Sequence, residues 1–238
     1  MEFDAAKIQK LRLNTSAFNL RIIEKEGISN IVCKLKNVDE NWVAFTEDDD
    51  TLTLSVTAKG AMIKTIWNTS SKRNIKIFVP QHKVFRSIRI GAGIGLTRLK
   101  NISCEKLNLA AGVGVSQLIN VNVEQKCKIA AGVGRVMIKN STFRDLSLNG
   151  GVGLTQFSGI LCGKSSISGG IGKIEMIIKA DRDDYDIKTK STFFDNIYID
   201  GALSKNYHHE NIDAEHTLRL SGGVGSIDLR FKNESADE

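Results

Sequence analysis

The sequence predicts an all-β fold, a parallel β-helix or solenoid with turns of about 19–20 residues and an irregular N-terminal β region. Three observations predict this fold. A glycine-containing tetrapeptide recurs at a nearly constant interval, apolar and polar residues alternate on both sides of it, and Asn residues recur at a fixed distance beyond it. Internal repetition of about this length is typical of proteins that stack one structural unit on the next.

The tetrapeptide consists of a small residue, a glycine, an aliphatic residue and a second glycine. Its glycine pairs are Gly93 and Gly95, Gly112 and Gly114, Gly132 and Gly134, Gly151 and Gly153, Gly170 and Gly172, and Gly223 and Gly225. The first five final glycines are 19, 20, 19 and 19 residues apart. We expect structural corners here, because the next turn lies only about 4.8 Å away and a side chain would meet its own copy.

Two consequences are expected at these corners. The aliphatic residue between the two glycines should plug the narrow end of the core. Gly132→Val should be severely destabilising, because a branched residue fits neither the corner conformation nor the tight stacking.

Alternation with a period of two predicts a strand on each side of every corner. Four residues after the final glycine stand Leu99, Leu118, Ile138, Phe157, Met176 and Leu229, and similar apolar columns precede the corner. We therefore expect two strands per turn and a mostly two-sheet helix. Hairpins with Gly and Asn in their loops are the alternative, but they would repeat in mirror order, whereas this order is direct.

A column of Asn residues predicts the second bend of each turn. Asn101, Asn120 and Asn140 stand six residues after the final glycine, and Gly159 follows in the same column. Asn and Gly tolerate a left-handed backbone. Stacked Asn side chains should hydrogen-bond along the axis, as amide ladders do in cross-β structures.

The chain divides by pattern into three parts. Residues 1–80 should form an N-terminal strand region or cap of the same domain, residues 81–231 the β-helix, and residues 232–238 a disordered tail. The acidic run Glu47–Asp50 is expected to be a hairpin turn, and Pro80 should end a strand.

The interval of 53 residues between Gly172 and Gly225 exceeds two turns. Phe193–Ile199 alternates as a strand after a corner does, so we expect one degenerate turn there. Ser204–Glu215 should be a polar surface insertion.

Composition excludes several classes of protein. Apolar residues make up 41% and charged residues 25% of the 238 residues, which is ordinary for a folded domain. The net charge of +6 comes from Lys and Arg scattered among Asp and Glu. No clustered basic face with aromatic residues is evident, so a nucleic-acid partner is not expected.

No run of about 18 apolar residues predicts a transmembrane segment. Met1–Lys10 lacks the apolar run of a secretory signal, so a full-length chain would be cytoplasmic. A trimmed targeting segment would leave a cell-surface or membrane-associated location open.

No cofactor or catalytic site is expected from the motifs. Strands, and not helices, follow the glycine corners, so no helix N-terminus holds a nucleotide phosphate. Calcium-binding repeats require Asp where Ile227 stands. Pectin-cleaving β-helices need several carboxylates on one face, whereas the outward column reads Arg98, Gln117, Met137, Gln156, Glu175 and Asp228. Enzymatic activity is therefore not expected.

The histidines and cysteines are interpreted as structural. His208, His209 and His216 form the one metal-like cluster, although no fixed spacing supports a site. Cys104 and Cys162 are assigned to one inward column, too far apart for a disulfide, with Cys127 in another and Cys33 in the flank. All four are expected to be buried thiols in a reducing compartment.

Taken together, the Gly-x-Gly turns, the lead-in Ile75–Pro80 and the closing segment from Gly222 to Leu229 resemble the bacterial β-strand-repeat proteins labelled "putative adhesin". The resemblance covers roughly residues 5–232. It implies a right-handed β-helix and no established activity.

The expected function is a non-enzymatic scaffold or interaction module, whose outer strand face with Arg98, Gln117, Gln156 and Glu175 contacts an unknown protein or surface partner. An assembling structural protein that joins through its open ends, as a homo-oligomer, is the alternative. A surface adhesin, or a carbohydrate-binding or carbohydrate-active β-helix, are more distant alternatives.

Overall fold

The chain is all-β in a computed structural model that describes residues 1–56 and 73–233. The strands of the N-terminal half are β1 (Glu2–Phe3), β2 (Lys10–Asn14), β3 (Asn19–Lys25), β4 (Ile31–Lys36), β5 (Val43–Asp48), β6 (Thr51–Val56), β7 (Asn74–Pro80), β8 (Val84–Gly91), β9 (Ile94–Ala110) and β10 (Val113–Ala130). Those of the C-terminal half are β11 (Val133–Arg144), β12 (Leu146–Asn149), β13 (Val152–Cys162), β14 (Lys164–Ser168), β15 (Ile171–Ile178), β16 (Tyr185–Lys190), β17 (Asp195–Ile199), β18 (Ala202–Leu203), β19 (His208–His209), β20 (His216–Ser221) and β21 (Val224–Phe231). Two short 3₁₀ helices, Glu40–Trp42 and Arg182–Asp184, precede β5 and β16.

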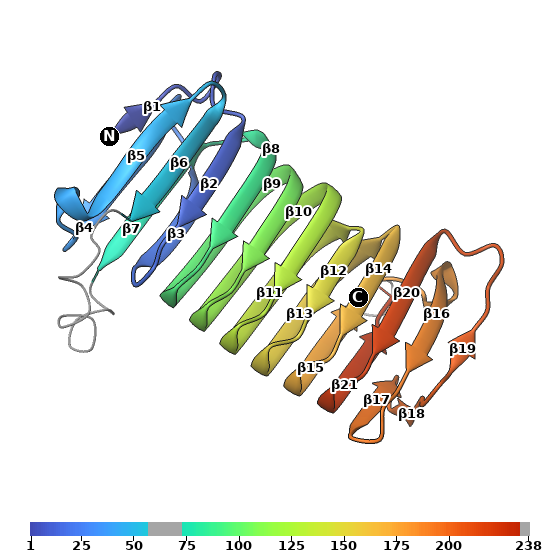
Figure 1. The fold of residues 1–238 in the computed structure, drawn as a ribbon. Coiled ribbons are helices and arrows are strands. Elements are labelled where there is room, and N and C mark those ends of the chain that lie inside the picture. The colour runs from blue at the N-terminus through green and yellow to red at the C-terminus, as the bar shows by residue number, and fades with distance from the viewer. Residues whose placement is uncertain (57–72, 234–238) are drawn as a thin grey trace.

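Successive coils of the chain stack in parallel to form an open, solenoid-like sheet (Figure 1). The final glycines of the tetrapeptide lie in one ladder, in the order Gly95, Gly114, Gly134, Gly153, Gly172 and Gly225. The register of the sequence repeat is therefore the register of the hydrogen-bonded stack. The direct order of the repeat predicted this parallel pairing, and antiparallel hairpins are confined to the two ends.

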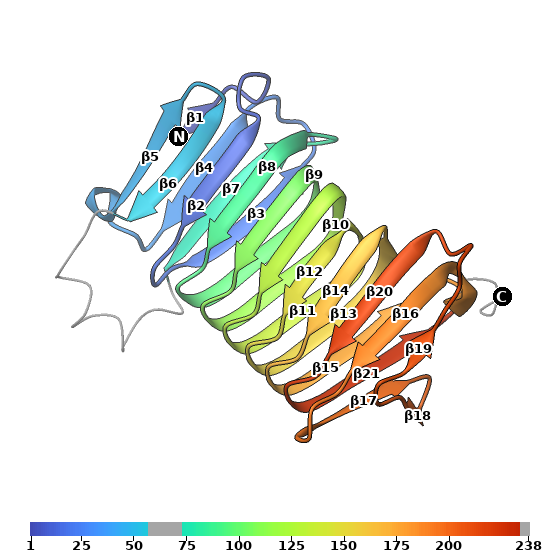
Figure 2. The same cartoon turned by 45° about the vertical axis from the view of Figure 1, so that its right-hand side comes forward.

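Each regular coil has three strand segments, and the expectation of two strands and two sheets was wrong. In β9 the buried pairs are Thr97 and Leu99, Ile102 and Cys104, and Leu107 and Leu109. Within each pair the buried residues are two apart, but Leu99 and Ile102 are three apart, and so are Cys104 and Leu107. The strand bends at these two places, where the alternation is interrupted. Figure 2 shows the resulting stack of coils turned to its side. The middle segment is short. In the sequence, the alternation was followed only directly before and after the corner, so this segment was missed.

The Asn column lies at the first of these bends. Asn101, Asn120 and Asn140 have φ of 55°, 53° and 48°. The Asn120 side-chain amide donates to Asn101 Oδ1 at 3.0 Å. Gly159 differs from the expectation, because it pairs with Ser141 after a register shift and its φ is not positive. One residue fewer at this bend moves every later residue of the segment by one position.

The shift also corrects the assignment of Cys162. Cys104 is followed in its ladder by Val123, Phe143 and then Leu161, while Cys162 pairs with Arg144 on the outward side. Cys162 is therefore half-buried, whereas the other three cysteines are buried. No pair of cysteines among the described residues forms a disulfide.

Inward side chains from all coils form one continuous apolar core. It extends from Ala5 to Leu229, and most of its members are aliphatic residues with exposed fractions near zero. The aromatic rings of Phe18, Phe85, Phe143 and Tyr185 are the largest fully buried side chains of this core.

At both ends of the stack, the spatial order of the coils departs from the sequence order. At the N-terminal end β2 lies between β6 and β8, and β3 lies between β7 and β9. At the C-terminal end β20 lies between β14 and β16, and β21 lies between β15 and β17. The expected degenerate turn is therefore present as β16 and β17. It is the last coil of the stack, and the coil of Gly222, although later in the sequence, lies between it and the coil of β14 and β15.

Antiparallel strands cover these terminal coils. β4 and β5 pair with β7 and β6 at one end, and the two-residue strands β18 and β19 pair with β17 and β16 at the other. The turn before Thr51 is the acidic hairpin that the sequence predicted, and Pro80 ends β7. The expected surface insertion instead contributes β19 to the covered end, and the expected tail lies, from residue 234, outside the described residues.

The corner glycines are required by backbone contact. A Cβ on Gly132 would lie 1.9 Å from the carbonyl oxygens of Ala111 and Gly112, although the φ of Gly132 is not positive. Gly132→Ala should therefore lower the free energy of unfolding by more than about 3 kcal/mol, because neither carbonyl can move without breaking the ladder. Urea denaturation measures this loss, and Gly132→Val should be at least as severe.

Gly201→Ala is the matched control. Gly201 has a φ of 85°, but a Cβ there would meet no atom within 4 Å. Its replacement should cost only about 1 kcal/mol, the backbone term alone. Equal losses for Gly132→Ala and Gly201→Ala would contradict the contact argument.

The covered ends generate a second prediction. Because very short antiparallel strands terminate the C-terminal end, coils of different molecules should not add end to end. The absolute mass from light scattering on a sizing column should stay constant over a wide range of protein concentration. A mass that climbs continuously with concentration would contradict the blunted ends and favour the assembling structural protein.

Candidate interaction surface

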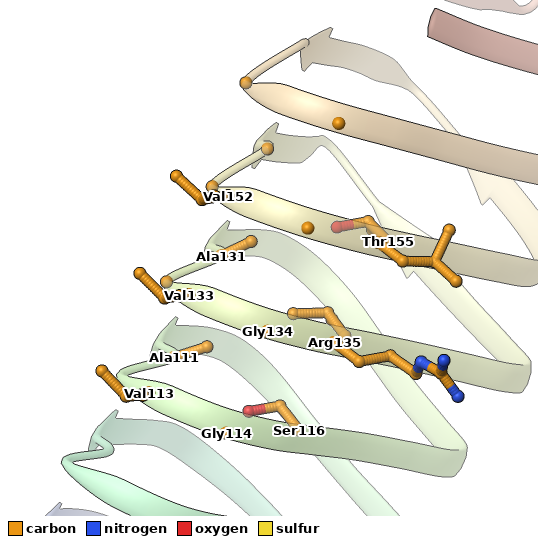
Figure 3. Close-up of a pocket in the computed structure, with 18 of the residues that line it drawn as sticks. Ala111, Val113, Gly114, Ser116, Ala131, Val133, Gly134, Arg135, Val152 and Thr155 are labelled. Carbon is orange, nitrogen blue, oxygen red and sulfur yellow. The ribbon is translucent and has the colours of Figure 1, made fainter. Parts of the chain in front are cut away.

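The aliphatic residues between the corner glycines form an exposed ridge along one edge of the stack. This corner ridge consists of Ile94, Val113, Val133, Val152, Ile171 and Val224, which are 46–58% exposed and lie in one parallel ladder. In Figure 3, Val113, Val133 and Val152 project outward from the tips of successive coils. The expectation that these residues plug the core was therefore wrong.

The direction of the side chains follows from the alternation on the far side of the corner. Thr97 is buried, and steps of two from Thr97 reach Gly95, so Ile94 falls on the outward face. The space inside the corner is instead closed by Ala111 and Ala131, which Figure 3 shows turned into the coil. Counting back from the buried position in this way would have found the ridge in the sequence.

Backbone hydrogen bonds hold the ridge rigid. Val113, Val133, Val152, Ile171 and Val224 each donate their N–H to a glycine carbonyl of the preceding coil at 2.8–2.9 Å. With coils about 4.8 Å apart, six residues give a stripe about 24 Å long. The ridge is thus fixed before any partner binds, and binding would cost little conformational entropy.

Two phenylalanines extend the ridge at its C-terminal end. Asp195 is in register with Gly225, so Phe194 follows Val224 in the ladder, and the Gly225 N–H donates to the Phe194 carbonyl at 3.2 Å. Phe193 and Phe194 are 91% and 70% exposed, and their rings meet edge to face. Solvent exposure of two large aromatic side chains side by side is unfavourable unless a partner covers them.

The exposed apolar side chains of the described residues gather on this edge. Eight of the twelve exposed large hydrophobic residues belong to the corner ridge or to the Phe193–Phe194 pair. Single exposed apolar residues are ordinary on protein surfaces, but a contiguous stripe indicates an interaction surface.

The outward columns beside the ridge carry several bases, and the nearest carboxylates on the leaving strands, Glu175 and Asp228, lie one column further from the ridge. On the strands that leave the corner, the neighbouring outward column is Leu96, Val115, Arg135, Leu154, Lys173 and Ser226. On the strands that enter it, the second outward column is Arg89, Asn108, Lys128, Ser147, Ser166 and Arg219. Bases therefore stand on both sides of the apolar ridge, and one of them, Lys173, is paired with Glu175.

We call the outer surface of the strands that lead into the corner the entering face, and that of the strands that follow the corner the leaving face. On the entering face, bases from separate parts of the sequence lie next to each other. Arg12 is in register with Arg89, and Lys106 with Lys126. Like charges at one coil spacing repel each other, so these pairs destabilise the fold slightly. The spacing of the repeat aligns Lys106 with Lys126, whereas only the pairing of β2 with β8 brings Arg12 to Arg89.

A groove of about 400 Å³ lies on this face, and its lining includes the bases Lys10, Arg12, Arg86, Arg89 and Lys106 and one carboxylate, Glu105. Asp50 lies 3.1 Å from both Lys10 Nζ and Arg86 Nη2. The hydrogen bond from Lys10 lowers the pKa of Asp50. Among the described residues, Arg12, Arg89 and Lys106 form no such ion pair.

The outer column that the sequence singled out for binding is bonded within itself. Arg98 Nε donates to Gln117 Oε1 at 2.7 Å, and Gln156 Nε2 donates to Glu175 Oε2 at 2.8 Å. Hydrogen bonds from Lys173 and Gln156 lower the pKa of Glu175. Because these polar groups already have partners along the stack, this column is a weaker candidate for binding than the ridge.

The interior behind the corner is too small for a ligand. Its cavity has a volume of about 20 Å³ and is lined by the glycine backbone, the inward alanines and the hydroxyls of Ser116 and Thr155. A space of this size holds about one water molecule.

The three histidines have separate partners. His208 Nε2 lies 3.0 Å from Asp186 Oδ1, His209 Nε2 lies 3.4 Å from Asp183 Oδ1, and the His216 ring packs on Tyr185. Within residues 1–56 and 73–233, no group of three or more His, Cys, Asp or Glu side chains is placed to hold a metal ion.

The cysteines provide a test of the register. Burial raises the pKa of Cys33 and Cys104 to about 12 and raises that of Cys127 well above its ordinary value. These three thiols should react with Ellman's reagent only after unfolding, because the thiolate is the reactive form and the side chains are covered. Half-buried Cys162 should react first in the native protein, and Cys162→Ser should abolish the native signal. Native labelling of Cys104 would contradict the shifted register.

No helix of the described residues is long and apolar enough to cross a membrane.

The comparisons with known proteins concern family and fold. No curated protein matches the chain in sequence. A solved structure from Bacteroides fragilis, titled "putative adhesin", shares 14% identity and covers 96% of this chain and 95% of its own, with a TM-score of 0.50. A "putative cell adhesion protein" from Clostridium sporogenes shares 12% identity and covers 98% of this chain and 97% of its own, with a TM-score of 0.43.

The family match covers most of the sequence. Residues 8–192 match the Toastrack DUF4097 family, which includes all but the last of the six glycine corners. The resemblance noted in the sequence and the likeness in fold agree with this match. The chain belongs to the Toastrack DUF4097 family.

Proposed function

We propose that the protein is a non-enzymatic interaction module, a right-handed β-helix that presents its corner ridge to a partner. Residues 81–231 would be the helix and residues 1–80 the cap that begins it. The corner glycines and the Asn column would be structural, and neither a metal nor a cofactor would take part.

One observation carries this proposal. Six aliphatic side chains and the Phe193–Phe194 pair line one edge of the stack, about half or more of each exposed, on a backbone fixed by the ladder. A monomeric protein gains no stability from such a stripe, whereas burial of apolar surface is the main favourable term in association. The described surface has no comparable convergence of acid, base and nucleophile around a cavity.

The adhesin-like relatives are consistent with a binding role, although they are dissimilar in sequence. The Bacteroides fragilis structure of similar fold is described as an adhesin, and a surface partner is the class that we propose for this chain as well. The alternative of assembly through the ends is less well supported, because antiparallel strands cover both terminal coils.

The proposal predicts that the ridge controls retention by a partner. The triple variant Val113→Thr, Val133→Thr and Val152→Thr keeps the branched shape but makes the stripe polar. Immobilised wild-type protein should retain a component of a bacterial homogenate, separated into membranes, soluble proteins and polysaccharides, at least tenfold better than the variant does.

Ile212→Ser is the matched control, since Ile212 is 90% exposed and lies outside the ridge. It should behave as the wild type, and all variants should unfold at the same urea concentration. Equal retention by wild type and triple variant in every fraction would refute the proposal. Steady turnover of a nucleotide, ester or glycoside by the pure protein would refute its non-enzymatic part.

A further inference from the structure

The corner ridge combines exposed apolar residues with flanking bases. From this combination we infer that the partner is an anionic lipid surface, on which the ridge inserts while the flanking bases contact the headgroups. The inference rests on the proposed function and names the class of partner. It differs from a transmembrane anchor because only side chains of the edge would enter the lipid.

The first step is the shape of the apolar surface. The corner ridge is a convex edge about 24 Å long, and not a pocket that would enclose a ligand or a peptide. A convex row of Ile, Val and Phe side chains fits the boundary between headgroups and acyl chains, where a shallow apolar insertion of about 5–10 Å is typical. Phe193 and Phe194, the most exposed members, would reach furthest at the C-terminal end.

The second step is the charge beside the ridge. Arg135 and Lys173 follow the ridge on the leaving face, and Lys128 and Arg219 lie one column further on the entering face. Lys173 is paired with Glu175 at 2.7 Å, whereas Arg135, Lys128 and Arg219 are exposed and form no ion pair among the described residues. Lys and Arg side chains beside an apolar surface extend their charged ends toward the polar boundary, where anionic headgroups lie.

The third step separates a lipid surface from a second copy of the chain. A dimer formed by two ridges would bring the flanking bases of one copy close to the same bases of the other. Lys173 is neutralised by Glu175 of the next column, but Arg135, Lys128 and Arg219 form no ion pair among the described residues. In such a dimer, the burial of apolar surface would therefore be opposed by repulsion between these bases. An anionic bilayer satisfies both requirements at once, because it offers an apolar layer below a negative one.

Aromatic stacking on the basic face would be the mark of a single-stranded nucleic-acid partner. The exposed aromatic pair lies instead on the ridge, at the end of the stack, and the flanking column on the entering face contains no aromatic residue. This arrangement favours lipid over nucleic acid.

The experiment is flotation of the full chain with vesicles of phosphatidylcholine alone and of phosphatidylcholine mixed with phosphatidylglycerol. Wild-type protein should float with the anionic vesicles, not with the neutral ones, and high salt should weaken the binding. The ridge triple variant and Phe193→Ser with Phe194→Ser should each reduce binding at least tenfold. In a Phe194→Trp variant, the added tryptophan emission should shift to shorter wavelength on anionic vesicles, which reports insertion.

Charge is tested with matched double variants. Lys128→Glu with Arg219→Glu should abolish flotation, whereas Lys34→Glu with Lys36→Glu, on exposed residues of β4 away from the ridge, changes the net charge equally and should leave it intact. If both double variants lost vesicle binding equally, the binding would depend only on the net charge of the protein, and the inference would be overturned.

Other outcomes separate this inference from the proposed function. If no vesicle binds but the ridge still controls retention by a protein or polysaccharide, only the lipid inference fails. A mass that doubles in the wild type and not in the ridge variant would identify a second copy as the partner. If ridge variants match the wild type in every assay, both proposals fail.

Discussion

Close contact of backbone with backbone at the corner is the constraint on which the rest of the structure depends. At each corner the carbonyl oxygens of one coil occupy the space that a Cβ of the next would need, at distances of about 2 Å. Only glycine leaves that space free, so six coils can turn at the same place and share one register. Stacking at one spacing then aligns every other column of the repeat, including the inward apolar residues that form a single core.

The same constraint creates the surface that we consider functional. A corner this tight leaves room inside for alanine or glycine alone, so the aliphatic residue between the glycines has to point outward. Repetition then turns one exposed side chain per coil into a continuous ridge, and it aligns Arg and Lys residues from distant parts of the chain beside that ridge. Backbone hydrogen bonds between successive coils fix the position of the ridge. These bonds do not depend on which side chains the ridge carries.

The two ends solve a different problem from the middle. In the regular coils each strand finds its partner one turn later, but the terminal coils lack a neighbour on one side. Both ends place an inner coil out of sequence order and cover the outermost one with short antiparallel strands. At the C-terminal end, the two-residue strands β18 and β19 leave little edge with which a second molecule could pair.

The sequence by itself determined the repeat, the parallel order, the corner glycines and the inward columns, because all of these recur with a period that a single chain displays. It did not reveal the third strand segment, the register shift at Gly159 or the order of the terminal coils, because these depend on pairing partners far away in the sequence. The ridge residues were misplaced although the alternation holds the information, because the count was not continued back from the buried column through the corner. Only the tertiary structure places Arg12 beside Arg89, because β2 lies outside the sequence repeat and becomes a neighbour of β8 only when the coils stack.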